Sequence, residues 1–205
     1  MTSRKQRALD CPHEVTAATT VKPLKKNATY DDLRNVPDHF VAEMLTGDLY
    51  AFPRPALPHA RASSVLGAVL TGPFDQGRNG PGGWLILDEP ELHFGNDVLV
   101  PDLAAWRRER LPVLPAEAYL TLGPEWVCEV LSASTESIDR GAKLRIYARE
   151  RVAHVWLIDP LRQTLEVLAL DAHRHWVEPD AFAGRTEVRA APFDAVALEL
   201  GALRI

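Results

Sequence analysis

Residues 126–158, WVCEVLSASTESIDRGAKLRIYARERVAHVWLI, decide the fold because two apolar segments flank a helical one. The first segment, 126–131, is almost continuously apolar, which is typical of a strand buried on both faces. Hydroxyl residues then precede a predicted helix over about 135–150. The second apolar segment, 152–158, predicts another strand, and 164–170 predicts its antiparallel partner. A strand, a crossover helix and a strand in this order predict two parallel neighbouring strands.

Two acidic residues and a lysine occur in segments that otherwise have the composition of a protein core. Asp102 lies in an apolar run over 98–105, Glu129 is the charged residue of 126–131, and Lys143 lies on the apolar side of the predicted helix. Burying such charges is unfavourable unless they are paired or bind a cation. A glutamate on a strand and a lysine on the next crossover helix can meet at the end of the sheet.

Two interpretations of these charges follow from the residues alone. In metal-assisted hydrolysis, carboxylates hold a hard cation such as Mg²⁺, the cation polarises a phosphoryl oxygen, and an ammonium stabilises the developing charge. In the structural interpretation, Asp102 ends a strand and Glu129 forms a salt bridge with Lys143 or Arg145 without any reaction. Both interpretations remain open at this point.

The N-terminal part of the chain predicts a tail, a hairpin and a helix. Residues 1–28 carry several basic residues without periodicity and predict a disordered tail, so 29–205 is expected to be a single domain. Two apolar runs within 41–52 surround a Gly-containing turn and predict a β-hairpin. Residues 59–70 are rich in Ala and Leu and predict a helix.

The middle of the chain predicts an antiparallel meander that leads into Asp102. Its three apolar segments are 84–87, 91–94 and 98–105. Residues 107–110, RRER, form a charged run that is typical of a solvated face, and we interpret it as the basic cluster near the proposed site.

Composition limits the classes of protein to consider. The 205 residues carry 23 Lys and Arg against 28 Asp and Glu, a formal net charge of -5, so nucleic-acid binding would need a local basic groove. The sequence lacks a run of about 18 apolar residues that could span a membrane, and it lacks the apolar core of a signal peptide. Two cysteines, Cys11 and Cys128, argue for a reducing compartment. We therefore expect a cytoplasmic protein without a membrane segment.

Short motifs occur in a fixed order within residues 29–170. They are EMLTGDLY at 43–50, Pro58-His59, VPDL at 100–103, EVLSAST at 129–135, DRGAK at 139–143 followed by Tyr147, and VWLIDP at 155–160. This series resembles the Uma-type family of restriction endonucleases, within the PD-(D/E)XK, restriction-endonuclease-like superfamily. The resemblance implies an α/β fold whose mixed central β-sheet is flanked by helices and preceded by a β-hairpin.

The resemblance also implies a metal-dependent endonuclease that acts on DNA. Asp102 and Glu129 match the metal ligands, and the expected cofactor is Mg²⁺, with Mn²⁺ as an alternative. The lysine of the superfamily signature is Leu131 here, so Lys143 on the helix is expected to be the catalytic lysine. Glu43 matches an early acidic position of the family and is a further catalytic candidate, as an outer ligand or a water contact; the alternative is a surface hairpin glutamate.

Weaker candidates and alternatives complete the prediction. His59 is a candidate for substrate binding, although a lone histidine is more often structural. Glu91, on a strand aimed toward the same region, has a lesser claim. Nucleases of this fold often act as dimers, so we expect a homodimer in which the edge strands after residue 164 form the interface. The alternative function is a non-catalytic nuclease-fold interaction module or a hydrolase of another phosphodiester, which the acidic balance favours.

Overall fold

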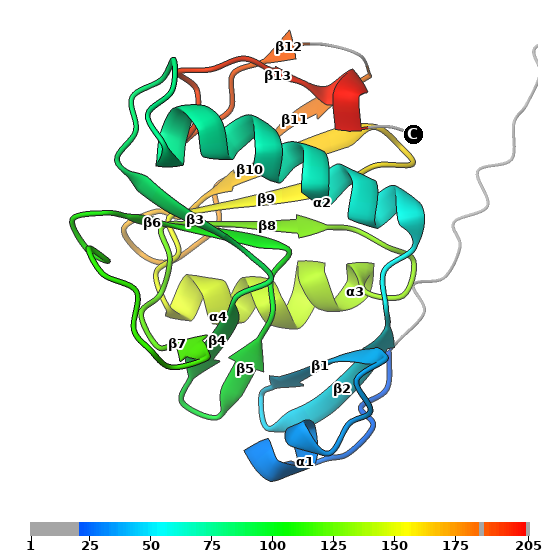
Figure 1. Ribbon diagram of the computed structural model, residues 1–205. Helices are drawn as coiled ribbons and strands as arrows, with labels where there is room; N and C mark the ends of the chain where they lie inside the picture. The colour runs from blue at the N-terminus through cyan, green and yellow to red at the C-terminus, as the bar shows by residue number, and fades with distance from the viewer. Residues whose placement is uncertain (1–20, 185–186, 204–205) are drawn as a thin grey trace, which may run out of the picture.

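The computed structural model describes residues 21–184 and 187–203, in which helices pack against β-sheets (Figure 1). The predicted tail lies outside the described residues as far as residue 20. Within residues 21–28, the backbone amides of Leu24 and Lys25 donate to the carbonyl of Leu49. In the described segments, no helix is long and apolar enough to cross a membrane.

One of the two larger sheets among the described residues has five strands, and it begins with the predicted hairpin. Strands β1 (Phe40–Leu45) and β2 (Asp48–Pro53) pair antiparallel over their whole length around the Thr46-Gly47 turn, which confirms the hairpin. Helix α1, Tyr30–Arg34, precedes them and is capped by Thr29. The order across the sheet is β2 (Asp48–Pro53), β1 (Phe40–Leu45), β5 (Asp97–Leu99), β4 (Glu91–Phe94) and β7 (Tyr119–Leu120).

The other large sheet, six-stranded in the described chain, is mixed and forms the centre of the fold. Its strands β8 (Trp126–Val130) and β9 (His154–Asp159) are parallel, as the strand, helix and strand order predicts, and β9 pairs antiparallel with β10 (Thr164–Ala169). The order is β11 (Asp180–Ala183), β10 (Thr164–Ala169), β9 (His154–Asp159), β8 (Trp126–Val130), β6 (Leu103–Arg107) and β3 (Trp84–Asp88). A small pair, β12 (Glu187–Val188) and β13 (Leu198–Glu199), lies near the end of the chain with η3 (Leu200–Leu203).

Helices cover both faces of the six-stranded sheet (Figure 1). On one face, α2 (Leu57–Leu70) continues into the π-helical turn η1 (Thr71–Asp75). On the other face, α3 (Glu136–Ile138), the π-helical turn η2 (Asp139–Lys143) and α4 (Leu144–Arg149) form one continuous helical segment.

Strand β8 divides its side chains between these two faces, as the alternation of a strand requires. Cys128 and Val130 pack in the core beneath α2, whereas Val127 and Leu131 pack in the core beneath α4. Glu129 therefore points toward the α3–α4 side, together with Val127 and Leu131. This confirms that a carboxylate projects from an otherwise apolar face.

The predicted single strand over 98–105 is wrong. Strand β5 ends at Leu99 in the five-stranded sheet, and β6 begins at Leu103 in the six-stranded sheet, so the chain crosses between the sheets. Pro101 has no amide hydrogen to donate to a strand ladder, which favours a break at this place. Asp102 consequently lies in the crossing and not on a strand face. The predicted meander is confirmed for β4 and β5, which pair antiparallel, and is wrong for β3, which pairs with β6 in the other sheet.

Candidate active site

A cavity of about 470 Å³ lies between the five-stranded sheet, the end of β8 and the helical segment that follows it. Strand β1, the crossing before β6 and the first turn of α2 complete its wall. The charged or ionisable side chains that line it are Glu43, Arg54, His59, Glu89, Asp102, Glu129, Asp139 and Lys143.

Lys143 lies at the centre of a buried cluster of carboxylates. Its Nζ is 3.0 Å from Oε1 of Glu43, 3.1 Å from Oε2 of Glu129 and 3.3 Å from Oδ1 of Asp139. Each of the four side chains exposes 6% or less of its surface. One ammonium thus faces three carboxylates away from water, and the cluster has an excess of negative charge if all of them are ionised.

The pKa values of the cluster follow from its burial and its charges. Burial raises the pKa of the carboxyl groups of Glu43, Glu129 and Asp139, although the ammonium of Lys143 opposes this increase. Burial would lower the pKa of Lys143, but the acidic neighbours outweigh it and raise that pKa well above its usual value. The lysine therefore stays protonated, and the buried acids bind protons more readily than exposed carboxyl groups do.

Backbone and side-chain hydrogen bonds fix the acids of the cluster. The carboxylate of Glu43 accepts a hydrogen bond from the backbone amide of Val100 at 2.8 Å. This bond joins β1 to the segment that crosses to β6. Tyr147, one turn beyond Lys143, donates its hydroxyl to Oε1 of Glu129. The turn η2 places Asp139 and Lys143 on the same side of the helix because they are four residues apart.

Asp102 lines the cavity beside this cluster, and its carboxylate contacts both the end of β8 and the start of α2. Its Oδ2 accepts the amide of Val130 at 2.7 Å, and its Oδ1 lies 3.3 Å from Nε2 of His59. Burial lowers the pKa of His59, but the hydrogen bond and the charge of Asp102, with a contribution from Asp139, outweigh burial and raise it. The Nδ1 atom of His59 is buried without a hydrogen-bond partner among the described residues.

The structure brings the predicted residues Glu43, His59, Asp102, Glu129 and Lys143 to one cavity. The predicted contact between Glu129 and Lys143 is present. Glu43 is 2% exposed, so the alternative of a surface glutamate is wrong.

One sequence candidate does not reach the cavity, and two residues of the cluster were missed. Glu91 accepts a hydrogen bond from the hydroxyl of Tyr30 and contacts the ring of His93, and it does not line this cavity. Asp139 and Tyr147 belong to the motifs of the predicted helix, but no role in the site was predicted for them. Asp139 lies four residues before Lys143 and Tyr147 four residues after it, so all three can share one side of the helix. This spacing is the signal that could have identified them.

The donor chemistry of the cavity fits a hard divalent cation. Asp102 and Glu129 offer carboxylate oxygens, and the acidic excess of the cluster would be reduced by a cation. Oδ1 of Asp139 is buried with an ion pair to Lys143 at 3.3 Å but without a hydrogen bond in the described chain. Among the described residues, no group of three or more His, Cys, Asp and Glu side chains could by itself hold a metal ion. Mg²⁺ usually takes one or two carboxylates from a protein and completes its shell with water and phosphate oxygens.

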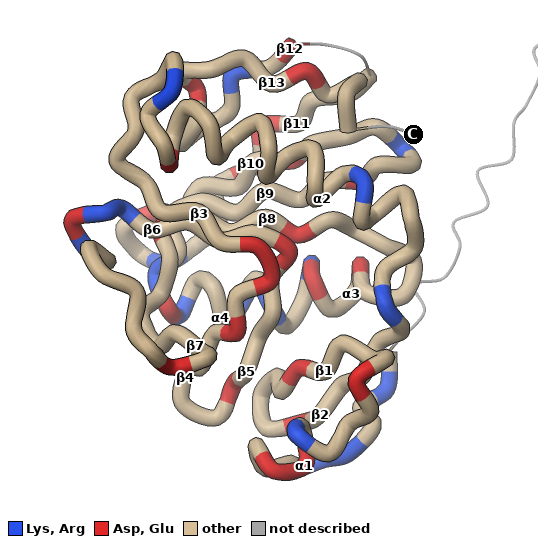
Figure 2. Tube along the Cα trace, in the orientation of Figure 1, with Lys and Arg blue, Asp and Glu red and all other residues tan. Residues whose placement is uncertain are grey.

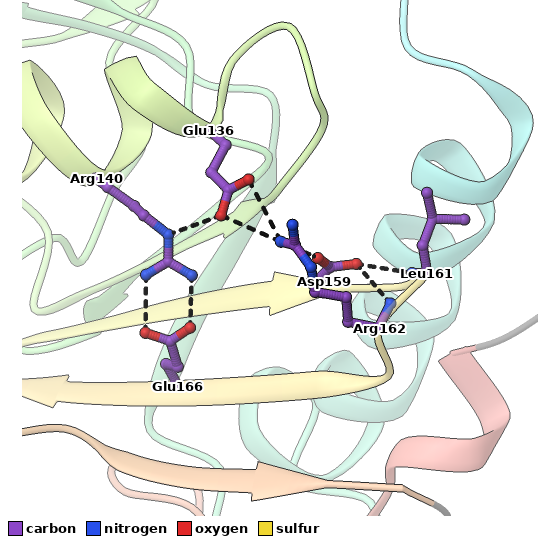
Figure 3. A network of polar contacts seen from close by, with 6 residues as sticks. All are labelled: Glu136, Arg140, Asp159, Leu161, Arg162 and Glu166. Atoms are coloured by element: carbon purple, nitrogen blue, oxygen red, sulfur yellow. Dashed lines mark hydrogen bonds and ion pairs between the residues drawn. The ribbon is translucent and has the colours of Figure 1, made fainter. Parts of the chain in front are cut away.

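A network of ion pairs fixes the rim of the cavity (Figure 3). Arg140, on η2, binds Glu166 of β10 with both Nη atoms, at 2.8 and 2.5 Å, and donates from Nε to Glu136. Arg162 lies between Glu136 and Asp159, its Nη1 being 2.9 Å from Oδ2 of Asp159. The start of the helical segment is thereby joined to the β9–β10 turn, which lines the cavity.

Comparisons with known proteins agree with this architecture. Residues 28–201 match the model of the Uma2 family, which is described as "putative restriction endonuclease". Among solved structures, the chain is similar to a putative nuclease of the DUF820 family from Anabaena variabilis ATCC 29413, with a TM-score of 0.69 and 20% identity over 86% of this chain and 97% of that one. At this identity the likeness shows the fold alone. A search of the curated proteins gave no match.

Proposed function

The chain belongs to the Uma2 family of putative restriction endonucleases, and from this premise we propose that it is a Mg²⁺-dependent endonuclease that hydrolyses phosphodiester bonds in DNA. Mn²⁺ is the alternative cation. The observation that carries the proposal is the cavity in which Asp102, Glu129 and Lys143 lie together with an excess of buried acid.

In this proposal Asp102 and Glu129 hold the cation, which when bound polarises a phosphoryl oxygen and acidifies a water molecule. Lys143 supplies a fixed positive charge where negative charge develops on the phosphate. Glu43 holds the ammonium of Lys143 from the other side, and it would serve a bound cation as an outer ligand or through a water contact. His59 orients Asp102 and faces the substrate from the start of α2.

The proposal predicts metal-dependent cleavage that depends on Asp102. Purified protein should cleave plasmid and linear DNA with Mg²⁺ or Mn²⁺ and not with EDTA. Asp102→Asn should lower the cleavage rate by at least about 100-fold, because it removes a ligand charge and leaves the shape of the side chain. Glu125→Gln is the matched control, since this acid pairs with Arg110 and lies outside the cavity.

Two outcomes would contradict the proposal. Cleavage that persists in EDTA or in Asp102→Asn would remove the metal site from the mechanism. A folded wild-type protein that cleaves no DNA with either cation would favour the non-catalytic interaction module, or a hydrolase of another phosphodiester.

We also propose a homodimer, with the outer edge of β11 as the interface. In the described chain β11 pairs with β10 on one side and ends the six-stranded sheet on the other, and such edges are sites of strand pairing between chains. Sedimentation would distinguish a dimer from the 22.7 kDa monomer. The cytoplasmic location stays a prediction.

A further inference from the structure

Arg54 differs from the other cationic side chains of the cavity in that its charge is not paired. Lys143 faces its acidic cluster, and His59 lies against Asp102. Arg54 instead donates from Nη2 to the backbone carbonyl of Asp38 at 2.9 Å, and the residue is exposed. Within residues 21–184 and 187–203, no carboxylate forms an ion pair with Arg54.

The chain around Arg54 limits its freedom to move. Arg54 follows Pro53, the last residue of β2, and precedes Pro55, and the rings of both prolines fix their backbone φ angles. The hydrogen bond to Asp38 holds the guanidinium against the segment before β1. A ligand that binds this guanidinium therefore meets a side chain that is already partly ordered, which lowers the entropy lost on binding.

A second groove, of about 440 Å³, continues from the cavity past Arg54. The cavity and the groove share Arg54, Val41, Glu89 and Val100 in their walls. Arg34, at the end of α1, lies in the wall of the groove and is also exposed, and no ion pair joins it to a carboxylate of the described chain. Two unpaired guanidinium groups thus belong to one path that leads outward from the buried carboxylates.

The basic cluster that the sequence suggested cannot take this role. Arg108 pairs with Asp75, Arg110 pairs with Glu125, and Arg107 lies over the ring of Trp84. None of the three arginines lines the cavity. Figure 2 shows the other Lys and Arg positions scattered over the fold and not gathered on one face. A polyanion that approaches the acidic cavity would therefore meet an unpaired positive charge at Arg54.

We propose that Arg54, with Arg34 beyond it, binds the phosphodiester backbone of the DNA strand beside the phosphate that is cleaved, and that the groove carries this strand away from the cavity. The inference rests on the proposed nuclease function. A planar guanidinium matches the oxygens of a phosphate and can bind two of them. Three acids, Asp38, Glu89 and Glu91, line the same groove and repel phosphate, so the strand approaches on the side of the guanidinium groups.

Fluorescence anisotropy tests this proposal with fluorescein-labelled duplex and single-stranded oligonucleotides in EDTA, over a series of NaCl concentrations. Arg54→Gln removes the charge but keeps an N–H group that can donate to Asp38. It should weaken binding about 5- to 10-fold and reduce the slope of log Kd against log salt by about one. Arg78→Gln is the matched control, because Arg78 is exposed and lies outside both the cavity and the groove. Unchanged melting temperatures would show that both variants fold.

The outcomes separate this inference from the proposed function. If the wild type cleaves DNA with Mg²⁺ while Arg54→Gln binds with wild-type affinity and slope, the inference is wrong and the nuclease function stands. Equal losses in Arg54→Gln and Arg78→Gln would also overturn it, because they indicate attraction by overall charge. A wild type that neither binds nor cleaves DNA would overturn both.

Discussion

Replacing Lys143 with Met is expected to lower the free energy of unfolding by about 3–5 kcal/mol. The ammonium lies within 3.3 Å of the carboxylates of Glu43, Glu129 and Asp139, and these acids are almost completely buried. Methionine nearly preserves the volume of the side chain, so the loss comes from the unpaired carboxylates and not from an empty space. Chemical denaturation monitored by tryptophan fluorescence measures this loss.

Lys25→Met is the matched control for this prediction. Lys25 also contacts an acid, with Nζ 2.6 Å from Asp32, but its side chain is 52% exposed and water screens the pair. Its loss of stability should be much smaller. Adding Glu129→Gln to Lys143→Met should restore part of the lost stability, because one buried charge is then removed. If Lys143→Met is no more destabilising than Lys25→Met, Lys143 does not compensate buried charge.

Glu129→Gln is expected to lower the rate of DNA cleavage by at least about 100-fold while the protein keeps its stability to within about 1 kcal/mol. The amide has the shape of the carboxylate, so its oxygen can accept from Lys143 and its NH₂ group can donate to the hydroxyl of Tyr147. Lys143 keeps its other contacts, with Glu43 and Asp139. The substitution therefore removes the charge that would hold a cation without disrupting the cluster.

Cleavage assays and denaturation of the same preparations test these two effects together. Glu125→Gln is the control, because Glu125 directly precedes the opposite end of β8 and pairs with Arg110. Wild-type cleavage by Glu129→Gln would remove Glu129 from the reaction. A large loss of stability would instead support the structural interpretation, in which Glu129 serves mainly as the salt-bridge partner of Lys143.

The centre of the fold could be predicted because its sequence pattern is local. The apolar run of β8, the amphipathic helix and the apolar run of β9 lie within 33 consecutive residues, 126–158, and a right-handed crossover is the common way to connect two parallel strands. The hairpin of β1 and β2 was predictable for the same reason, since its Gly-containing turn joins adjacent strands.

The region around Asp102 could not be predicted from such a local pattern. Apolar residues on both sides of Pro101 have the composition of one strand, yet they pair in different sheets with partners that are distant in the sequence. Leu99 belongs to β5, whereas Leu103 belongs to β6 and pairs with Cys128 of the neighbouring strand β8. The choice between one strand and two depends on these tertiary partners, which composition does not specify.

The candidate site was predictable where charge and apolar surroundings conflict within one segment. Glu129 stands out because the rest of β8 is apolar, and Lys143 stands out on the packed side of its helix. Asp139 gave a weaker signal, because an acid near a helix start has a favourable interaction with the helix dipole and needs no other explanation. Arg54, in a proline-rich connection, gave no signal, since an unpaired charge is visible only when its surroundings are known.

Titration of Mg²⁺ into the wild type and into Glu129→Gln by isothermal calorimetry tests the proposed metal site most directly. The wild type should bind the cation, and Glu129→Gln should bind it at least about 10-fold more weakly while remaining folded. Absence of Mg²⁺ and Mn²⁺ binding to the wild type, or equal affinities of the two proteins for the cation, would contradict the assignment of Glu129 as a metal ligand in a nuclease site.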